Sequence, residues 1–155
     1  MKIRKAQIKD AQRIAELLKT IAKLHHNGRP DIYEDCAKYD IKAVEEMIND
    51  KTKYIFAAVD ENDFVTGYVI SYITERKFHA SNGLNNTMYV DDLCVDENYR
   101  HQNIGKELMQ KARDNAKAQG CYNLELNVWS FNKAAVSFYE SCGMTEQRRR
   151  MEIIL

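Results

Sequence analysis

Residues 88–120, MYVDDLCVDENYRHQNIGKELMQKARDNAKAQG, decide how this chain folds. They predict an apolar strand, a short polar turn through Arg100, and a helix that opens at Asn103-Ile104-Gly105 and ends at Gly120. The unpaired N–H groups of a helix N-terminus, just past the end of a strand, suit an anionic phosphate group. The stretch therefore predicts a site for a nucleotide-like cofactor.

The segments on either side of this stretch alternate between strand and helix patterns. The sequence predicts a strand over 3–6, a helix from Asp10 to Gly28, a loop over 25–39, a helix capped by Asp40, a hairpin of strands 53–59 and 64–73, a turn at Ser81-Asn82-Gly83 before strand 88–95, a strand over 123–129, a short helix opened by Asn132 and ended at Cys142-Gly143, and a final strand over 151–155. The predicted order is β-α-α-β-β-β-α-β-α-β.

The composition is that of one ordinary globular domain over residues 1–155, with 45% hydrophobic and 30% charged residues. Because 23 Lys+Arg balance 23 Asp+Glu, there is no overall positive field to attract nucleic acid, and no nucleic-acid partner is expected. No stretch approaches the roughly 20 apolar residues of a membrane span, and the N-terminus lacks the apolar core of a signal peptide. We therefore expect no membrane partner and a cytoplasmic location.

The four cysteines lie far apart in the sequence and form no CxxC pair. Such spacing predicts reduced thiols rather than disulfides or a zinc site. His25 and His26 are adjacent, and adjacent histidines rarely bind one metal ion together. No metal site is expected.

The chain resembles the GNAT family of acyl-CoA-dependent N-acetyltransferases over nearly its whole length. Three features carry the resemblance: the element order, the run VDENYRHQNIG at the central turn, and the run NKAAVSFYESCGM after the next strand. The resemblance implies an α/β (α+β) fold, in which a mixed, mostly antiparallel sheet of 6–7 strands is splayed at the fourth strand and flanked by about four helices. The family's turn motif is Arg/Gln-x-x-Gly-x-Gly/Ala. This chain has Arg100, Asn103 and Gly105, so asparagine replaces the first glycine. Asparagine tolerates left-handed backbone geometry, so we expect the turn to form, with the side chain crowding the pyrophosphate.

The resemblance also implies acetyl-CoA as the acetyl donor. Backbone N–H groups over 101–106 would hold its pyrophosphate, and the main chain over 93–95 would pair with its pantetheine amides like an added strand. The residues implied to contact the cofactor are Leu93, Cys94, Val95, Arg100, His101, Gln102, Asn103, Ile104, Gly105, Lys106, Asn132, Ala135 and Phe138. For Asn132, a helix N-cap is an equally good interpretation.

Tyr139 stands where many members of the family place the general acid that protonates the thiolate of coenzyme A. A phenol with a pKa of about 10 suits this role. The alternative is a tyrosine that packs by its ring and keeps its hydroxyl on water.

Asp91 and Asp92 interrupt an otherwise apolar strand, and burial of unpaired carboxylates is costly. At least one is therefore expected to face the substrate cleft. Successive strand residues point to opposite faces, so both can reach the cleft only if a bulge, which is typical of this family's central strand, intervenes. The segment YVDDLCVDENYR is similar to the acidic strand of spermidine/spermine acetyltransferases, which implies that Asp91 is a base or an ammonium ligand. A carboxylate bonded to a neighbouring backbone group or arginine is the alternative.

The acceptor is expected to lie under the loop after the first helix, which overlies the acceptor site in this family. The residues assigned to it are His25, His26, Arg29, Asp31 and Tyr33. The acidic residues near it favour a primary amine of a small cationic, polyamine-like metabolite. The alternative acceptors are a protein N-terminus or ribosomal protein and an aminoglycoside-like antibiotic. The alternative function is a non-catalytic acyl-CoA-binding module.

Family members often dimerise, so a homodimer is also considered.

Overall fold

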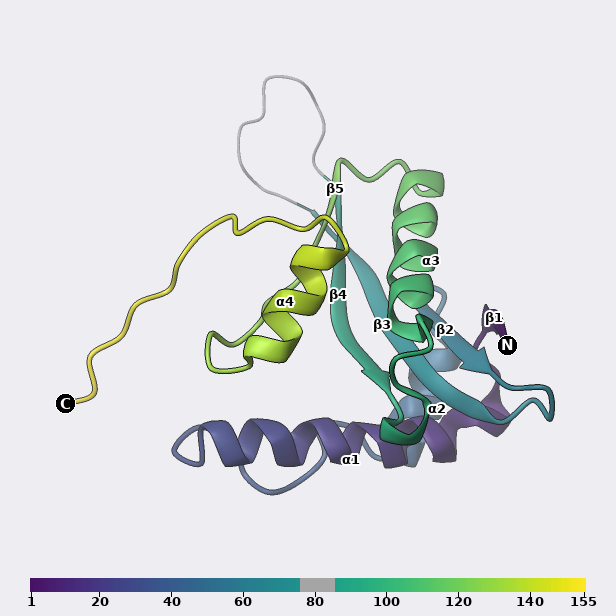
Figure 1. The fold of residues 1–155 in the computed structure, drawn as a ribbon. Coiled ribbons are helices and arrows are strands. Elements are labelled where there is room, and N and C mark those ends of the chain that lie inside the picture. The colour runs from purple at the N-terminus through teal and green to yellow at the C-terminus, as the bar shows by residue number, and fades with distance from the viewer. Residues whose placement is uncertain (76–85) are drawn as a thin grey trace.

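The computed structural model describes residues 1–75 and 86–155 (Figure 1). Its elements are β1 (Lys2–Lys5), the 3-10 turn η1 (Ile8–Asp10), α1 (Ala11–Gly28), α2 (Ile41–Asn49), β2 (Lys53–Val59), β3 (Val65–Glu75), β4 (Asn86–Val95), the 3-10 turn η2 (Glu97–Tyr99), α3 (Ile104–Ala118), β5 (Asn123–Glu125) and α4 (Lys133–Ser141). The predicted turn at Ser81-Asn82-Gly83 lies outside the described residues.

The strands form one sheet in the order β1-β2-β3-β4-β5. Neighbouring strands are antiparallel from β1 to β4, and β4 pairs with β5 in parallel. The sheet is therefore mixed and mostly antiparallel, as expected, and β2 with β3 forms the predicted hairpin. Four α-helices flank it in the described part of the chain, which also agrees with the prediction.

The predicted count of 6–7 strands is wrong, because the described residues form five. The strand expected over 123–129 stops after Glu125, and residues 144–155 form neither helix nor strand. In the segment expected as a final strand, Met151 and Ile153 are each 86% exposed. An apolar alternation becomes a strand only when another strand edge pairs with it, and here the sheet ends at β5.

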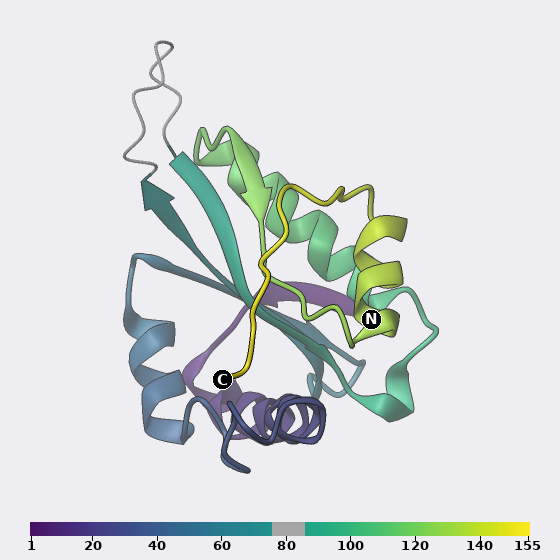
Figure 2. The same cartoon turned by 90° about the vertical axis from the view of Figure 1, so that its left-hand side faces the viewer.

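The two faces of the sheet are covered by different helices (Figure 2). On one face, α1 and α2 enclose a core with β2 and β3, in which Ile14, Leu18 and Tyr68 are fully buried. On the other face, α3 packs through Ile104, Leu108 and similar residues. Two small residues of α3, Ala112 and Ala116, are also buried, which allows close packing of the helix on the sheet.

Most of the predicted helix ends are present and are explained by neighbouring residues. Asp40 caps α2 by accepting the Ala43 N–H at 2.8 Å, and Gly120 follows α3 with φ 68°, the left-handed conformation that glycine favours. Asp10 was expected to cap α1, yet its carboxylate instead accepts the N–H of Gln7 at 2.7 Å and pairs with Arg4. The predicted helix end at Gly28 is confirmed, so the loop that was predicted from residue 25 onward begins only after Gly28.

Candidate active site

The sheet opens between β4 and β5. These strands pair only over Thr87–Tyr89 with Asn123–Glu125, and after β5 the chain turns away from β4 toward α4 (Figure 1). Over 90–95, β4 keeps its ladder with β3 on one side, while β5 no longer pairs on the other side. The sheet is thus splayed at its fourth strand, as the resemblance implied, and within the described residues no strand pairs with the other edge of β4 over 93–95.

The turn that leads into α3 has the backbone geometry predicted for Asn103. This residue lies in the left-handed region at φ 62° and ψ 5°, and its side chain makes no cap hydrogen bond. His101 also has a positive φ, 63°. Because the first N–H groups of a helix have no partner within it, those of 104–106 are free to bind an anion.

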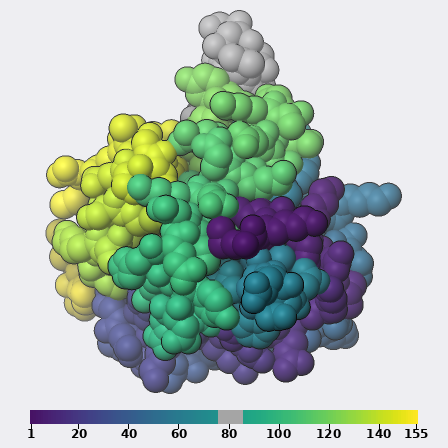
Figure 3. All heavy atoms as spheres, turned by 45° about the vertical axis from the view of Figure 1, so that its right-hand side comes forward, coloured from purple at the N-terminus to yellow at the C-terminus, as the bar shows by residue number. Residues whose placement is uncertain are grey.

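Helix α4 packs directly beside this turn. A Cβ added to Gly105 would lie 3.0 Å from the Phe138 ring, so a larger residue there would push α4 away from α3. In Figure 3 the segment leading into α3 and helix α4 lie next to one another on one face of the molecule. The arrangement fits a bound phosphate-bearing cofactor, because the free N–H groups of α3 and the open edge of β4 lie next to each other.

The other residues assigned to the cofactor have observed structural roles. Asn132 accepts the Ala135 N–H at 3.1 Å and so caps α4, as its alternative interpretation held. Arg100 donates from Nε to the Val95 carbonyl at 3.5 Å. Leu93 and Val95 pack on the α3 side, while Cys94 lies in the α1 core, where burial raises the pKa of its thiol to about 12. His101, Gln102 and Lys106 are exposed around the turn, and Ile104 is buried.

A β-bulge in β4 places Asp91 and Asp92, as the sequence analysis allowed. Ser71 pairs with Val90 and Ile70 with Asp92, so Asp91 is the extra residue without a partner in the register. Both carboxylates consequently contact residues from the α1 side of the sheet: Asp91 binds Tyr39, and Asp92 binds Tyr68.

Asp92 is bonded to Tyr68, a fully buried residue of β3. Tyr68 Oη donates a hydrogen bond to its Oδ1 at 2.9 Å. Burial raises the pKa of Asp92 to about 6, the Tyr68 hydrogen bond opposes this rise, and the charge of Asp91 adds to it. Burial, followed by the charge of Asp92, also raises the pKa of the Tyr139 phenol, so Tyr139 keeps its proton at neutral pH and lies within electrostatic range of Asp92.

Asp91 is held by two residues of the segment between α1 and α2. Lys38 Nζ lies 2.7 Å from Oδ1 and 2.9 Å from Oδ2, and Tyr39 Oη donates to Oδ2 at 3.0 Å. The Asp91 side chain is only 10% exposed, whereas that of Lys38 is 53% exposed. A nearly buried carboxylate thus has a solvent-accessible counter-ion.

The residues assigned to the acceptor form a separate cluster at the end of α1. The His25 ring lies 5.1 Å from that of Tyr33, and Tyr33 meets the Trp129 ring edge-on at 5.8 Å. Arg29 forms ion pairs with Asp31 and Glu152, which ties this cluster to the C-terminal segment. His26 Nδ1 lies 2.7 Å from the Tyr33 carbonyl. Both histidines belong to the last turn of α1, not to the loop after it.

His25 connects this cluster to the carboxylates. Burial, and then the positive charge of Lys38, lowers the pKa of His25, so the two side chains are within electrostatic range. The structure therefore places Asp91 next to Asp92 on β4, Tyr139 within electrostatic range of Asp92, and His25 within electrostatic range of Lys38.

Sequence reasoning missed the partners of the two carboxylates: Lys38, Tyr39 and Tyr68. Tyr68 stands in an apolar strand, where a tyrosine resembles any other core residue. Lys38 and Tyr39 lie more than fifty residues from Asp91, and only the observed hydrogen bonds of the folded chain bring them together. The available signal was that Lys38 and Tyr39 directly precede Asp40, the cap of α2.

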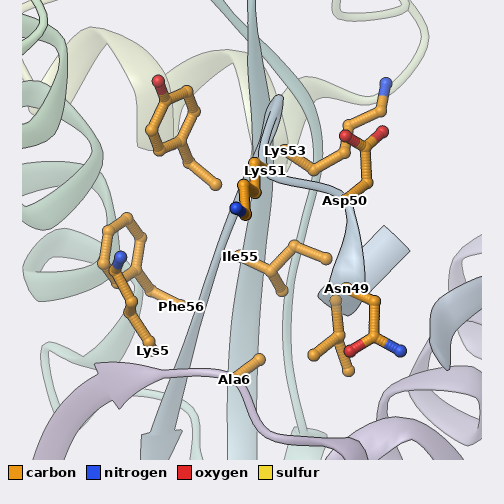
Figure 4. Close-up of a pocket in the computed structure, with 10 residues that line it drawn as sticks. Lys5, Ala6, Asn49, Asp50, Lys51, Lys53, Ile55 and Phe56 are labelled. Atoms are coloured by element: carbon orange, nitrogen blue, oxygen red, sulfur yellow. The ribbon is translucent and has the colours of Figure 1, made fainter. Parts of the chain in front are cut away.

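A shallow pocket lies elsewhere on the molecule. Its lining comes from β1, the end of α2, β2 and the segments that join them, and it includes Lys5, Asp50 and Phe56 (Figure 4). The carboxylate of Asp50 is already used there by the Thr52 hydroxyl and N–H, both at 2.8 Å. None of the residues assigned to the candidate site lines it.

Among residues 1–75 and 86–155, no helix is long and apolar enough to cross a membrane. The four cysteines of the chain are free.

Comparison with known proteins identifies the fold and its relatives. The acetyltransferase (GNAT) family profile matches residues 18–144. Mouse thialysine N-epsilon-acetyltransferase is 28% identical over 147 residues, which cover 92% of this chain and 82% of that protein. Arabidopsis thaliana glucosamine 6-phosphate N-acetyltransferase is 32% identical over 81 residues, 52% of this chain. The crystal structure of a mutant of the BH1408 protein from Bacillus halodurans superposes with a TM-score of 0.93 at 28% identity, over 100% of this chain and 99% of that one.

The matched regions are short in some relatives. The chain spans about half the length of the first relatives it matches: 51% of the Arabidopsis enzyme and 44% of bovine thialysine N-epsilon-acetyltransferase.

Proposed function

The chain belongs to the acetyltransferase (GNAT) family, and we propose that it transfers an acetyl group from acetyl-CoA to a primary amine of a small cationic molecule. Enzymes of this family use acetyl-CoA as the acetyl donor. The observation that carries the proposal is Asp92: a buried carboxylate, bonded to Tyr68, with a pKa raised to about 6, in electrostatic range of a protonated Tyr139. Amine acylation needs a proton acceptor and a proton donor in one site.

The free edge of β4 and the N-terminus of α3 would hold the donor. The edge of β4 over 93–95 that faces away from β3 would pair with the pantetheine amides, and the N–H groups of 104–106 suit the pyrophosphate. Gly105 lets α4 approach this turn through Phe138, the residue next to Tyr139, which supports a place for Tyr139 near the donor. When bound, acetyl-CoA supplies the acetyl group as a thioester.

The residues of the chain would then handle two protons. An amine with a pKa near 10 arrives mostly as an ammonium, and Asp92 would accept its proton. The amine nitrogen forms a bond to the acetyl carbon while the carbon–sulfur bond breaks. Tyr139 would give its proton to the sulfur that leaves, and the second proton that the nitrogen loses as it becomes an amide would restore the Tyr139 phenol. The resemblance assigned the base to Asp91, but Asp91 already pairs with Lys38, so its contacts favour Asp92 for this role.

The charge of the site supports a cationic acceptor. The bulge directs two adjacent carboxylates to one side of β4, and such a pair attracts an ammonium. The mouse relative is named for the ε-amino group of thialysine, also a small-molecule amine.

The test is turnover of acetyl-CoA with a panel of acceptors: polyamines, amino acids, aminoglycosides, and peptides with free N-termini. Calorimetry first measures acetyl-CoA binding, and thiol release then measures transfer. We expect binding, and release that depends on a small cationic amine. Absence of acetyl-CoA binding contradicts the proposal; binding without turnover on any amine indicates a non-catalytic acyl-CoA-binding module. Preference for a peptide would move the acceptor to a protein N-terminus.

A further inference from the structure

We propose that Asp91 and Tyr39 form a subsite for a second ammonium group of the acceptor, and that Lys38 fills this subsite in the free protein. The inference rests on the proposed function, because it takes Asp92 to face the amine that reacts. It makes alkyl diamines the preferred acceptors, with one ammonium at Asp91 and the other at Asp92.

The contacts around Lys38 are those of a bound alkylammonium ion. Its Nζ reaches both oxygens of Asp91, at 2.7 and 2.9 Å, and lies 4.9 Å from the centre of the Tyr39 ring. A carboxylate together with an aromatic face is a strong combination for such a cation. Tyr39 also donates its hydroxyl proton to Asp91, which orients the carboxylate. Lys38 therefore shows what the subsite would bind.

Two tyrosines near Asp91 also form a surface on which a cation lies over an aromatic ring. Tyr72 on β3 and Tyr89 on β4 lie with their ring centres 5.5 Å apart, and Lys53 Nζ lies 4.0 Å from the centre of the Tyr72 ring. Burial, and then the charge of Asp91, raises the pKa of Tyr72, so its ring remains a neutral phenol near the carboxylate. The surroundings of Asp91 are thus suited to an alkyl chain that carries positive charge.

The exposures of the two partners make an exchange feasible. Asp91 is 10% exposed and would be costly to leave unpaired, so any group that displaces Lys38 must itself be a cation. Lys38 is 53% exposed and has a flexible side chain, so it can turn into solvent when another ammonium arrives. The exchange keeps Asp91 neutralised throughout. A neutral or anionic acceptor gains nothing from it.

The bulge fixes how the two subsites are related. Asp91 and Asp92 are adjacent in the chain, with Cα atoms about 3.8 Å apart, and their carboxylates turn to the same side of the sheet to meet Tyr39 and Tyr68. One short alkyl chain can therefore connect ammonium groups at both. Putrescine is a suitable probe, and n-butylamine is its matched analogue with a single charge.

The experiment is calorimetric titration of putrescine and n-butylamine, without acetyl-CoA, into the wild-type protein and four variants. Lys38→Met removes the internal cation, Asp91→Asn removes the carboxylate, and the double variant combines them. Lys42→Met, at an exposed position on α2, is the control. Thermal unfolding verifies that each variant is folded.

We expect Lys38→Met to bind putrescine about fivefold more tightly, because the competing internal cation is gone. Asp91→Asn should bind it about tenfold more weakly, with the affinity of n-butylamine, since a charge-assisted contact is lost. The double variant should resemble Asp91→Asn, and Lys42→Met the wild type. Unchanged or weaker binding by Lys38→Met would overturn the proposal, and this variant decides the matter alone if Asp91→Asn does not fold.

The titrations separate this inference from the proposed function. Because they contain no acetyl donor, unaltered putrescine affinity in Lys38→Met refutes the subsite even if putrescine is acetylated. Tight, Lys38-dependent binding without acetylation of any amine refutes the proposed transfer and retains the subsite.

Discussion

The phenol oxygen of Tyr68 lies 2.9 Å from Oδ1 of Asp92 and donates a hydrogen bond to it. Tyr68 belongs to β3 and Asp92 to the strand beside it, and the bulge at Asp91 brings the carboxylate to the face where Tyr68 is buried. Burial raises the pKa of Asp92 while this hydrogen bond lowers it, and the balance lies at about 6. Asp92 therefore changes charge close to neutral pH.

Replacing Asp92 by asparagine should change how stability depends on pH. The pKa of Asp92 is raised from 3.8 to about 6 on folding, so its contribution to stability is present below pH 3.8 and is lost as the pH rises through about 6. As the pH rises from about 4.5 to 8, the unfolding free energy of Asp92→Asn should therefore increase by roughly 2 kcal/mol relative to that of wild type. Urea denaturation at the two pH values measures this. Asp114→Asn, at an exposed carboxylate on α3, is the control, and an equal response in both variants would exclude burial as the cause.

Replacing Tyr139 by phenylalanine should lower kcat by about 100-fold, the lower range for loss of a general acid. The ring packing on Phe138, at 5.1 Å, remains, so acetyl-CoA affinity should hardly change. Steady-state kinetics and calorimetry separate the two effects. Tyr122→Phe is the matched control, since Tyr122 is 62% exposed. An unchanged kcat in Tyr139→Phe would remove Tyr139 from the role.

The backbone at Asn103 can be tested with a pair of variants. Its φ of 62° is strained for most residues. Asn103→Ala should lose about 1 kcal/mol of unfolding free energy, whereas Asn103→Gly should be at least as stable as wild type. Urea denaturation compares them. If the backbone holds the pyrophosphate, Asn103→Gly binds acetyl-CoA as well as wild type or better, and a large loss would show that the asparagine side chain makes the contact.

The sequence predicted those features that depend on neighbouring residues. The start of α3 after Asn103, the glycine beyond its end, and the cap at Asp40 each follow from local backbone chemistry, and all three are present. The final strand over 151–155 was wrong because a strand also depends on a distant partner edge.

The same limit applied to the candidate site. Asp91, Asp92 and Tyr139 could be singled out because a motif surrounds them, and the bulge was anticipated from the resemblance. Lys38 and Tyr68 could not, since an exposed lysine and a strand tyrosine are common and have no signature. Their importance comes from hydrogen bonds that span 53 and 24 residues of sequence.

The most direct test is the pH dependence of kcat/KM for putrescine acetylation in wild type, Asp92→Asn and Tyr68→Phe. For wild type we predict that kcat/KM falls on the acid side of the profile with a pKa of about 6. In Asp92→Asn this acidic limb should disappear, together with most of the activity. Tyr68→Phe removes the hydrogen bond that lowers the pKa of Asp92, so its limb should move to higher pH while the enzyme remains active above it. A limb that is the same in wild type and Tyr68→Phe, or that persists in Asp92→Asn, would contradict the assignment of Asp92 as the proton acceptor.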